Sequence, residues 1–171
     1  MNKFMIMFWT AIVMMITMTM NDAISGEFYK NDNNSREGMF NGMIQMGDAM
    51  KLYHAHDNSL VYLSSPGGNA WEGLTMGYII KGKNLHVSTY EGQKCESACA
   101  FAALMGKTIH GVYGFHAPYP VGYTPSEQEL KYIRNIFVRY MQSTGKLTDT
   151  QINKIMNTSS NELIYFTWDM Q

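Results

Sequence analysis

Short apolar runs alternate along the chain with stretches of helical periodicity, and this order predicts alternating strands and helices. Residues 60–63 form an unbroken apolar run, which is typical of a buried strand. Residues 85–90 alternate in polarity and are rich in β-branched side chains. Further strands are expected at residues 108–115 and 163–168, so strands recur from residue 60 to the C-terminal region.

Helices are predicted between these strands and after them. Ser126 and Glu129 have the spacing of a capping box, which indicates that a helix begins at residue 127. The stretch that follows Cys95 consists of small and apolar residues, so its helix is expected to be buried. The predicted helices span residues 70–80, 97–105, 127–144 and 149–156.

The region before residue 60 has a weaker pattern. Residues 27–38 are polar and rich in Asn, and we expect a loop or the end of a short strand there. Four methionines at helical spacing suggest one amphipathic helix, but Gly42 and Gly47 interrupt it. We therefore favour a short strand at residues 43–44 and a helix over residues 48–56, with Asp48 as its N-cap.

Together these elements predict an α/β fold with mostly parallel strands. Glycines follow or interrupt several of the predicted strands, where the chain must turn. In open parallel sheets, functional groups gather at the carboxyl ends of the strands. We therefore expect functional residues in the turns that follow the strands.

The N-terminal segment has the pattern of an export signal. Lys3 precedes an uncharged run at residues 4–20, and Ala23 and Ser25 fit the small-x-small cleavage pattern. We expect cleavage after Ser25, which leaves one domain over residues 26–171. The run is also close to the length that spans a membrane, so an uncleaved anchor is the alternative. Either outcome places the domain in the periplasm or cell envelope, and the anchor would associate it with the membrane.

Charge and cysteine content narrow the function classes. The net charge is −1, so no basic excess directs the chain to nucleic acid. Cys95 and Cys99 are the only cysteines, and in an oxidising compartment they could form a disulfide. Too few ligands surround them for a zinc site. His54 and His56 do not share a helix face, so they are not predicted to bind a metal. We predict no metal site and no cofactor.

Three short motifs carry the candidate chemistry. Ser97 lies between small residues at a strand-to-helix turn, and His116 follows the next predicted strand. A serine becomes a nucleophile only when a base takes its proton, so the two side chains together are a candidate nucleophile and base. The turn at Gly67 and Gly68 comes directly after the apolar run at residues 60–63, and its backbone amides could stabilise an oxyanion.

These motifs resemble the Clp protease/crotonase superfamily, and more narrowly its small exported ClpP-like branch. The resemblance rests on Gly67-Gly68, on Cys95-x-Ser97-Ala98-Cys99 and on Gly114-Phe115-His116, and it runs from about residue 42 to residue 170. It implies a spiral of repeated β-β-α units. It also implies serine peptidase chemistry with Ser97 as nucleophile, His116 as general base, and the amides of Gly68 and Ala98 as the oxyanion hole.

The third catalytic position departs from the family pattern. Where the peptidase relatives carry an aspartate that orients the histidine, this chain has Asn161. An asparagine can hold a histidine but cannot stabilise imidazolium by charge. Glu162 and Asp149 are the alternatives for this position.

Two functions follow. The first is an exported serine peptidase or related hydrolase that acts on peptides or proteins in the cell envelope. The second is a catalytically weak or inactive ClpP-like fold that serves as a binding or assembly protein. An acyl-CoA enzyme of crotonase type fits an exported protein less well. The resemblance also implies a homo-oligomer.

Overall fold

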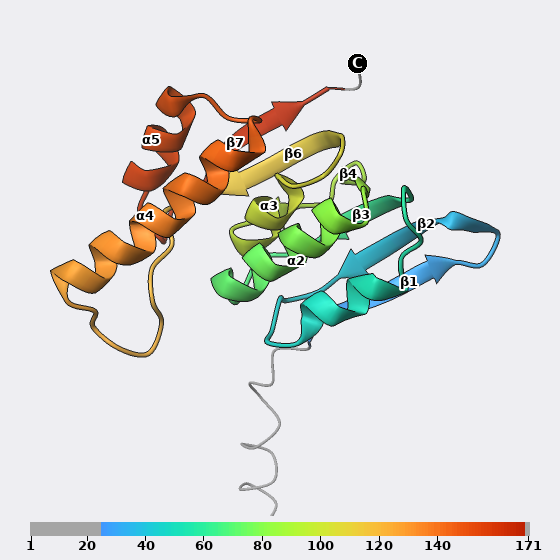
Figure 1. Ribbon diagram of the computed structural model, residues 1–171, viewed down its shortest axis with the longest axis horizontal. Coiled ribbons are helices and arrows are strands. Elements are labelled where there is room, and N and C mark those ends of the chain that lie inside the picture. Colours follow the sequence, from blue (N-terminus) through green and yellow to red (C-terminus); the bar gives the residue numbers. More distant parts are fainter. Residues whose placement is uncertain (1–24, 170–171) are drawn as a thin grey trace, which may run out of the picture.

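The computed structural model describes residues 25–169 (Figure 1). The strands are β1 (Glu27–Asn31), β2 (Asn34–Asn41), β3 (Leu60–Ser64), β4 (His86–Ser88), β5 (Cys95–Glu96), β6 (Ile109–Phe115) and β7 (Ile164–Trp168). The helices are the 3₁₀ helix η1 (Asp48–His54), α2 (Ala70–Gly82), α3 (Ala98–Ala103), α4 (Glu127–Thr144) and α5 (Asp149–Asn157). The helices and strands predicted after residue 60 are confirmed, with small shifts at their ends.

The strands form one seven-stranded, mostly parallel sheet in the order β1-β2-β3-β4-β6-β5, with β7 added beside β6. The pairs β2–β3, β3–β4, β4–β6 and β5–β6 are parallel. Only the hairpin β1–β2 and the pair β6–β7 are antiparallel among the named strands. The prediction of an α/β fold with mostly parallel strands is therefore confirmed.

Residues 27–38, where we expect a loop or the end of a short strand, instead contain β1 and most of β2. This segment forms the hairpin β1–β2, and β2 then pairs in parallel with β3. Gly38 and Phe40 face the core while their neighbours along the strand are more exposed, so the segment does alternate with a period of two. The first three residues of β2 are exposed, and its polar residues hide that alternation in the sequence.

Two further expectations in this region need correction. Residues 43–44 form isolated bridges to Ser25 and Gly68 and do not form a strand. The helix expected over residues 48–56 is the shorter 3₁₀ helix η1, whose N-cap is Gly47. The Asp48 carboxylate accepts a hydrogen bond from the Gln45 amide of the preceding loop, so it fixes the loop and does not cap the helix.

The core lies where α2, α3 and α4 meet over the sheet, and Figure 1 shows α2 and α3 side by side. All six residues of α3 are buried, as predicted from its composition. The Tyr140 hydroxyl of α4 donates to the Phe101 carbonyl of α3 over 2.9 Å. The rings of Phe101 and Phe137 pack edge to face at 5.0 Å between centroids. The start of α3 is thus held from several sides.

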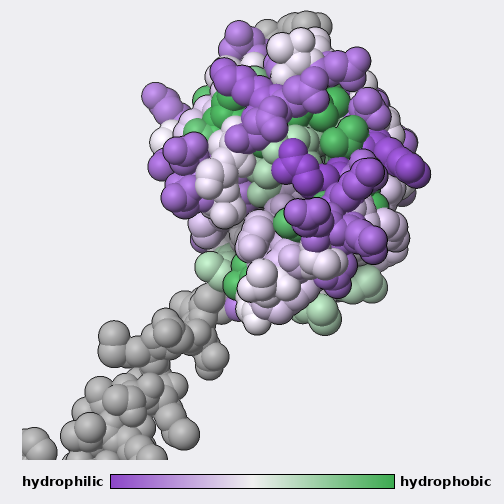
Figure 2. Space-filling view, turned by 90° about the vertical axis from the view of Figure 1, so that its left-hand side faces the viewer, coloured by the Kyte–Doolittle hydropathy of each residue, from purple (hydrophilic) through white to green (hydrophobic). Residues whose placement is uncertain are grey.

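The start of α4 confirms the capping box. The Ser126 amide donates to the Glu129 carboxylate over 2.8 Å, and the Glu129 amide donates to the Ser126 hydroxyl over 3.3 Å. The bonds that the carboxylate accepts from the Ser126 amide and hydroxyl lower the pKa of Glu129. Figure 2 views the molecule from the side of α4 and α5 and shows mainly hydrophilic residues, with hydrophobic ones in small groups between them.

Of the predicted signal or anchor at residues 1–25, residues 1–24 lie outside the described residues. No helix within residues 25–169 is long and apolar enough to cross a membrane.

Candidate active site

The three predicted motifs lie at the carboxyl ends of neighbouring parallel strands. Cys95 and Glu96 of β5 pair with Tyr113 and Gly114 of β6. On its other side β5 meets the end of β3, because the Glu96 amide donates to the Ser65 carbonyl over 2.9 Å. The turn after β3, the turn after β5 and the residue after β6 are thereby brought together at one edge of the sheet.

Ser97 adopts a backbone conformation that few side chains tolerate. Its φ is 51° and its ψ is −119°, and such conformations cost about 1–3 kcal/mol. The Ser97 amide donates to the Gly114 carbonyl over 2.8 Å, which continues the β5–β6 ladder by one residue. The Ser97 carbonyl accepts from the Phe101 amide and begins α3. The chain therefore reverses direction sharply at this residue.

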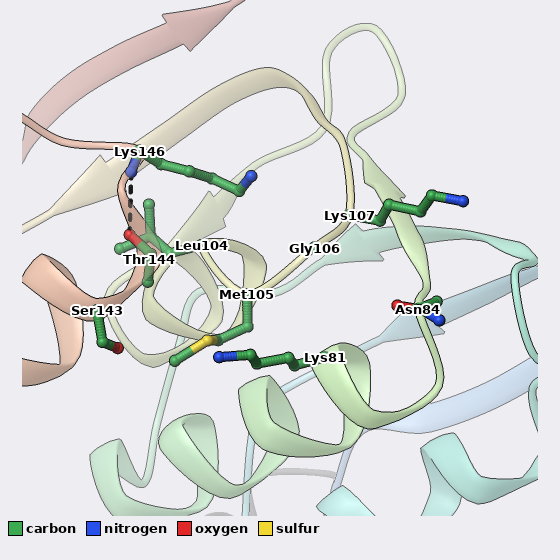
Figure 3. Close-up of a pocket in the computed structure, with 9 residues that line it drawn as sticks. All are labelled: Lys81, Asn84, Leu104, Met105, Gly106, Lys107, Ser143, Thr144 and Lys146. Atoms are coloured by element: carbon green, nitrogen blue, oxygen red, sulfur yellow. Dashed lines mark hydrogen bonds between the residues drawn. The ribbon is translucent and has the colours of Figure 1, made fainter.

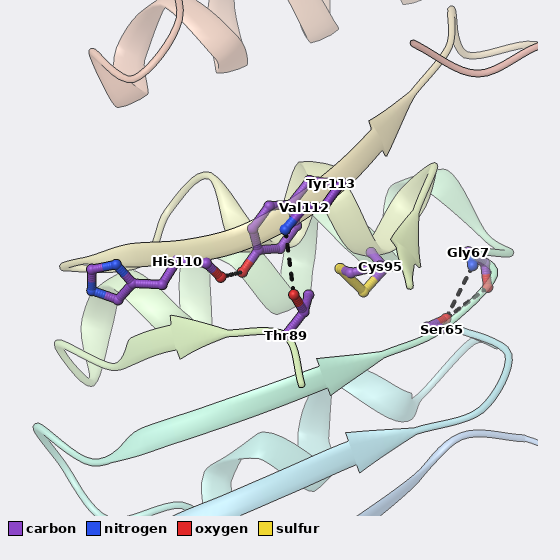
Figure 4. The surroundings of a disulfide bond; sticks show 8 residues. Ser65, Gly67, Thr89, Cys95, His110, Val112 and Tyr113 are labelled. Carbon is purple, nitrogen blue, oxygen red and sulfur yellow. Dashed lines mark hydrogen bonds between the residues drawn. A yellow bond between two sulfur atoms is a disulfide. The ribbon is translucent and has the colours of Figure 1, made fainter. Parts of the chain in front are cut away.

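A disulfide spans this turn. Cys95 at the end of β5 is bonded to Cys99 in α3, and their Cα atoms are 5.2 Å apart. Figure 4 shows this bond between β6 and the turn that holds Ser65 and Gly67. The predicted pairing is confirmed, and a disulfide of this kind is typical of proteins in an oxidising compartment. It ties together the two residues that flank the Ser97 turn.

Gly67 lies directly against the Ser97 turn. A Cβ atom at this position would come within 2.7 Å of the Ser97 Cβ and 2.9 Å of the Glu96 carbonyl oxygen. Its φ of +98° also disfavours any side chain. The Gly67 amide donates to the buried hydroxyl of Ser65 over 3.0 Å, a bond that Figure 4 shows. Only glycine lets the two turns approach so closely.

Two backbone amides flank this contact, those of Gly68 and Ala98. Ala98 is the first residue of α3, so its N–H has no partner within the helix. Neither the Gly68 nor the Ala98 amide donates a hydrogen bond to another residue in the range 25–169. These are the two amides predicted to form an oxyanion hole; Gly68 is exposed, whereas Ala98 is fully buried beside Gly67.

Backbone bonds to Ile44 fix the turn of Gly67 and Gly68. The Ile44 amide donates to the Gly67 carbonyl over 2.7 Å, and the Asn69 amide donates to the Ile44 carbonyl over 2.8 Å. Asp48, which is 2% exposed, holds the residue after Ile44 by accepting from the Gln45 amide over 2.7 Å. The loop before η1 therefore supports the turn.

Asp48 remains charged although it is buried. Burial alone would raise the pKa of its carboxyl group, but hydrogen bonds from Ser25, Gln45 and Lys51 outweigh burial and lower it. The Ser25 hydroxyl donates over 2.6 Å, and the Lys51 ammonium lies at 3.1 Å. This carboxylate is engaged in holding the loop before η1.

His116 is half-buried and follows directly after β6. Its Nδ1 atom lies 2.8 Å from the carbonyl oxygen of Ala117. A carbonyl can only accept, so Nδ1 carries the proton in this contact. In the neutral ring the lone pair is then on Nε2, which is the atom that a general base needs free. The Ala117 amide donates to the Thr158 carbonyl over 3.0 Å, so the residue that orients the ring is itself fixed.

The strand register places Ser97 and His116 near each other. Glu96 pairs with Gly114, so Ser97 lies level with Phe115, and His116 is one residue further on. Both residues thus leave adjacent parallel strands at the same edge. The Ser97 side chain makes no hydrogen bond with another described residue.

None of the three candidates for the third position makes a hydrogen bond to His116 within the described residues. The Asn161 side chain is exposed and accepts a hydrogen bond from the Ser159 hydroxyl. Asp149 is exposed at the start of α5 and accepts from Gln142. Glu162 is also exposed. Within the described chain the His116 ring bonds to the Ala117 carbonyl, so the role of these three residues stays a prediction.

Two interactions at this site could not be predicted. The Ala117 carbonyl gives no signal in a sequence, because every residue has a backbone carbonyl. The Tyr165 hydroxyl of β7 donates to the Glu96 carboxylate over 2.6 Å, and this bond raises the pKa of Tyr165. It secures the residue before Ser97, and only the fold brings Tyr165 beside it.

Two pockets are lined in part by residues of the site. One of about 320 Å³ begins at Gly68, and another of about 460 Å³ begins at Ala117. Tyr119 borders both pockets, and Tyr123 borders the first. The nearby aromatic residues Tyr113 and Phe115 do not line a groove, because both are fully buried and belong to the core.

The described residues contain no group of three or more His, Cys, Asp or Glu side chains that could hold a metal ion. No protein-family model matches the chain, and no curated protein matches it.

Proposed function

We propose that the chain is an exported serine hydrolase of the peptidase type, with a ClpP-like spiral fold. The observation that carries the proposal is the Ser97 turn, which lies between two amides that make no hydrogen bond within the described chain. It lies beside β6, the strand that His116 directly follows. A strained serine at a strand-to-helix turn is a recurrent arrangement for a nucleophile. The disulfide supports export.

In the proposed reaction, the Ser97 hydroxyl attacks the carbonyl carbon of a peptide bond or ester. His116 Nε2 takes the hydroxyl proton and then gives it to the leaving amine or alcohol. The amides of Gly68 and Ala98 stabilise the oxyanion of the tetrahedral intermediate, and each such donor contributes about 10²–10³ in turnover. Water, activated by His116, then hydrolyses the acyl-enzyme and restores Ser97.

The partner of Nδ1 determines how fast this reaction can be. The Ala117 carbonyl selects the correct tautomer, but it is neutral and stabilises imidazolium less than a carboxylate would. We therefore expect turnover well below that of a serine enzyme with a complete triad.

The substrate class follows from the pocket at Gly68. Its lining includes the exposed aromatic residues Trp71, Tyr119 and Tyr123 and the apolar residues Ile133 and Phe137. Such a lining favours a large apolar side chain. We propose that substrates are peptides or proteins that carry such a residue next to the cleaved bond.

Turnover in matched variants tests this function. The oxidised protein is assayed against a panel of peptides and activated esters, together with Ser97→Ala and His116→Ala. Ser35→Ala and His54→Ala serve as controls, because both residues are exposed and lie in β2 and η1, outside the proposed catalytic residues. Loss of turnover in the first pair but not in the second supports a hydrolase. Equal turnover in all variants contradicts it.

A second candidate is a binding or assembly protein that retains the fold without catalysis. The observation that favours it is the position of Asn161, whose side chain bonds to Ser159. In that case the chain shows no turnover that depends on Ser97, and peptides bind equally well to the wild type and to Ser97→Ala.

A further inference from the structure

A third pocket lies at the opposite end of α3 from Ser97. It has a volume of about 210 Å³ and is formed where α2, α3 and α4 end (Figure 3). Lysines from three different segments line it: Lys81 in the last turn of α2, Lys107 after α3, and Lys146 after α4. Its other lining residues are Asn84, Leu104, Met105, Gly106, Ser143 and Thr144.

The positive charges of this pocket are not compensated. None of the nine lining residues is acidic. Within residues 25–169, none of the three lysines forms a salt bridge, whereas Lys51, Lys83 and Lys94 all do. The whole chain has a net charge of −1, so this concentration of charge is local. Three unpaired ammonium groups around one pocket favour an anion.

Lys146 is the most constrained of the three lysines. It is partly buried, and its amide donates to the Thr144 hydroxyl over 3.2 Å, a bond that Figure 3 shows. Burial without a carboxylate partner lowers the pKa of its side chain. Leu104 is fully buried beneath the pocket, and Met105 is nearly so. An anion at this position would meet a partly desolvated charge, which strengthens the attraction.

From this arrangement we propose that the pocket binds a phosphate group. All its cations are lysines, which bind phosphate as point charges. The hydroxyls of Ser143 and Thr144 already donate to the carbonyls of Tyr140 and Met141. The ammonium groups and the Asn84 amide therefore provide the recognition. This binding is independent of the hydrolase activity.

Helix ends offer a competing explanation for the lysines. Cations near helix C-termini interact favourably with the unpaired carbonyls there, and three helices end at this pocket. A purely structural role predicts that neutral variants lower the thermal midpoint and that phosphate has no effect. A binding role predicts a rise in the thermal midpoint with phosphate that depends on the lysines.

The test measures binding of inorganic phosphate to the full chain by calorimetry and thermal shift, in about 150 mM NaCl so that nonspecific attraction is screened. We expect Lys146→Gln to weaken binding about tenfold and Lys81→Gln to weaken it by a similar factor. Lys107→Gln should have a smaller effect, because its side chain extends away from the other two in Figure 3. Lys131→Gln is the matched control, since Lys131 is exposed on α4 outside the pocket.

A second arm identifies the source of the phosphate. Glycerol phosphate in solution is compared with vesicles that contain phosphatidylglycerol, using the same variants. A preference for the vesicles that Lys146→Gln abolishes assigns the site to a lipid headgroup, and the reverse preference assigns it to a soluble phosphate compound. The proposal is overturned if phosphate does not bind, or if Lys146→Gln and Lys131→Gln bind it as the wild type does. Neither result bears on turnover at Ser97.

Discussion

The Ser97 turn and the segment at residues 158–162 face the same candidate site, but they are held very differently. The Ser97 turn is fixed by a disulfide, by a backbone bond to Gly114 and by direct contact with Gly67. The segment at residues 158–162 is largely exposed, and it is linked to the residue after His116 by the Thr158 carbonyl, which accepts a hydrogen bond from the Ala117 amide.

This difference separates two requirements of catalysis. In the proposed reaction the nucleophile and the oxyanion amides need accurate backbone positions, which favours a turn held by a disulfide and by backbone contacts. The orienting group for the histidine needs only one acceptor at Nδ1, and a fixed backbone carbonyl can supply it. The site therefore has two parts. We call the Ser97 turn with Gly67 the rigid half, and His116 with the segment at residues 158–162 the minimal half. Substitutions in the rigid half should lower turnover far more than substitutions of the residues expected to orient His116.

His116→Ala should cause the largest loss of turnover. It removes the general base, and we expect turnover to fall by about 10²–10⁴. The side chain is only half-buried, so the thermal midpoint should change little. The measurement is kcat on an activated ester. If turnover instead falls by no more than about twofold, the loss is far smaller than removal of a general base should cause. Another base would then act at Ser97.

Gly67→Ala should follow, with a loss of about a hundredfold, similar to the loss of an oxyanion-hole donor. The added Cβ would meet Ser97 and Glu96 and would force the two turns apart. Gly122→Ala is the control, because Gly122 also has a positive φ but no atom within 4 Å of an added Cβ. If both variants lose turnover equally, contact with Ser97 is not the cause.

Reduction of the disulfide should lower turnover by about tenfold, because a small displacement of the nucleophile is enough. The short loop that it closes contributes about 2 kcal/mol on the chain-entropy model, so the thermal midpoint should fall by about 4–8 °C. Turnover is measured well below that midpoint, with and without reductant. The double variant Cys95→Ala/Cys99→Ala is expected to be insensitive to the reductant. Full activity of the reduced protein would contradict a positioning role.

Asn161→Ala should have the smallest effect, below about twofold in turnover, because its side chain bonds to Ser159. Asp149→Asn and Glu162→Gln should behave in the same way. A loss of about a hundredfold in any of the three, as expected for a catalytic group, would identify the missing third member and would remove the contrast between the two halves of the site.

Much of the fold could be predicted from the sequence. Periodicity and capping signals located the helices after residue 60, and the capping box of Ser126 and Glu129 is present as expected. The hairpin β1–β2 was not predicted, because its exposed polar residues hide the alternation that burial of Phe40 reveals. The two-residue strand β5 is too short to give a pattern of its own, and it exists only because β3 and β6 hold it.

Less of the site could be predicted. The disulfide pairing followed from having only two cysteines, and the residue types drew attention to Ser97 and His116. The contacts of Gly67, the Ala117 carbonyl and the bond from Tyr165 to Glu96 depend on tertiary structure and leave no residue pattern. The lysine pocket also joins residues that are far apart in the sequence.

Covalent labelling by a fluorophosphonate, mapped by mass spectrometry, tests most directly whether Ser97 is an activated nucleophile. We expect a single adduct on Ser97 in the oxidised protein, formed much more slowly in His116→Ala and absent in Ser97→Ala. If the adduct forms on another residue and persists in Ser97→Ala, or if Ser97 is not labelled at all, Ser97 is not an activated nucleophile and the proposed hydrolase is wrong.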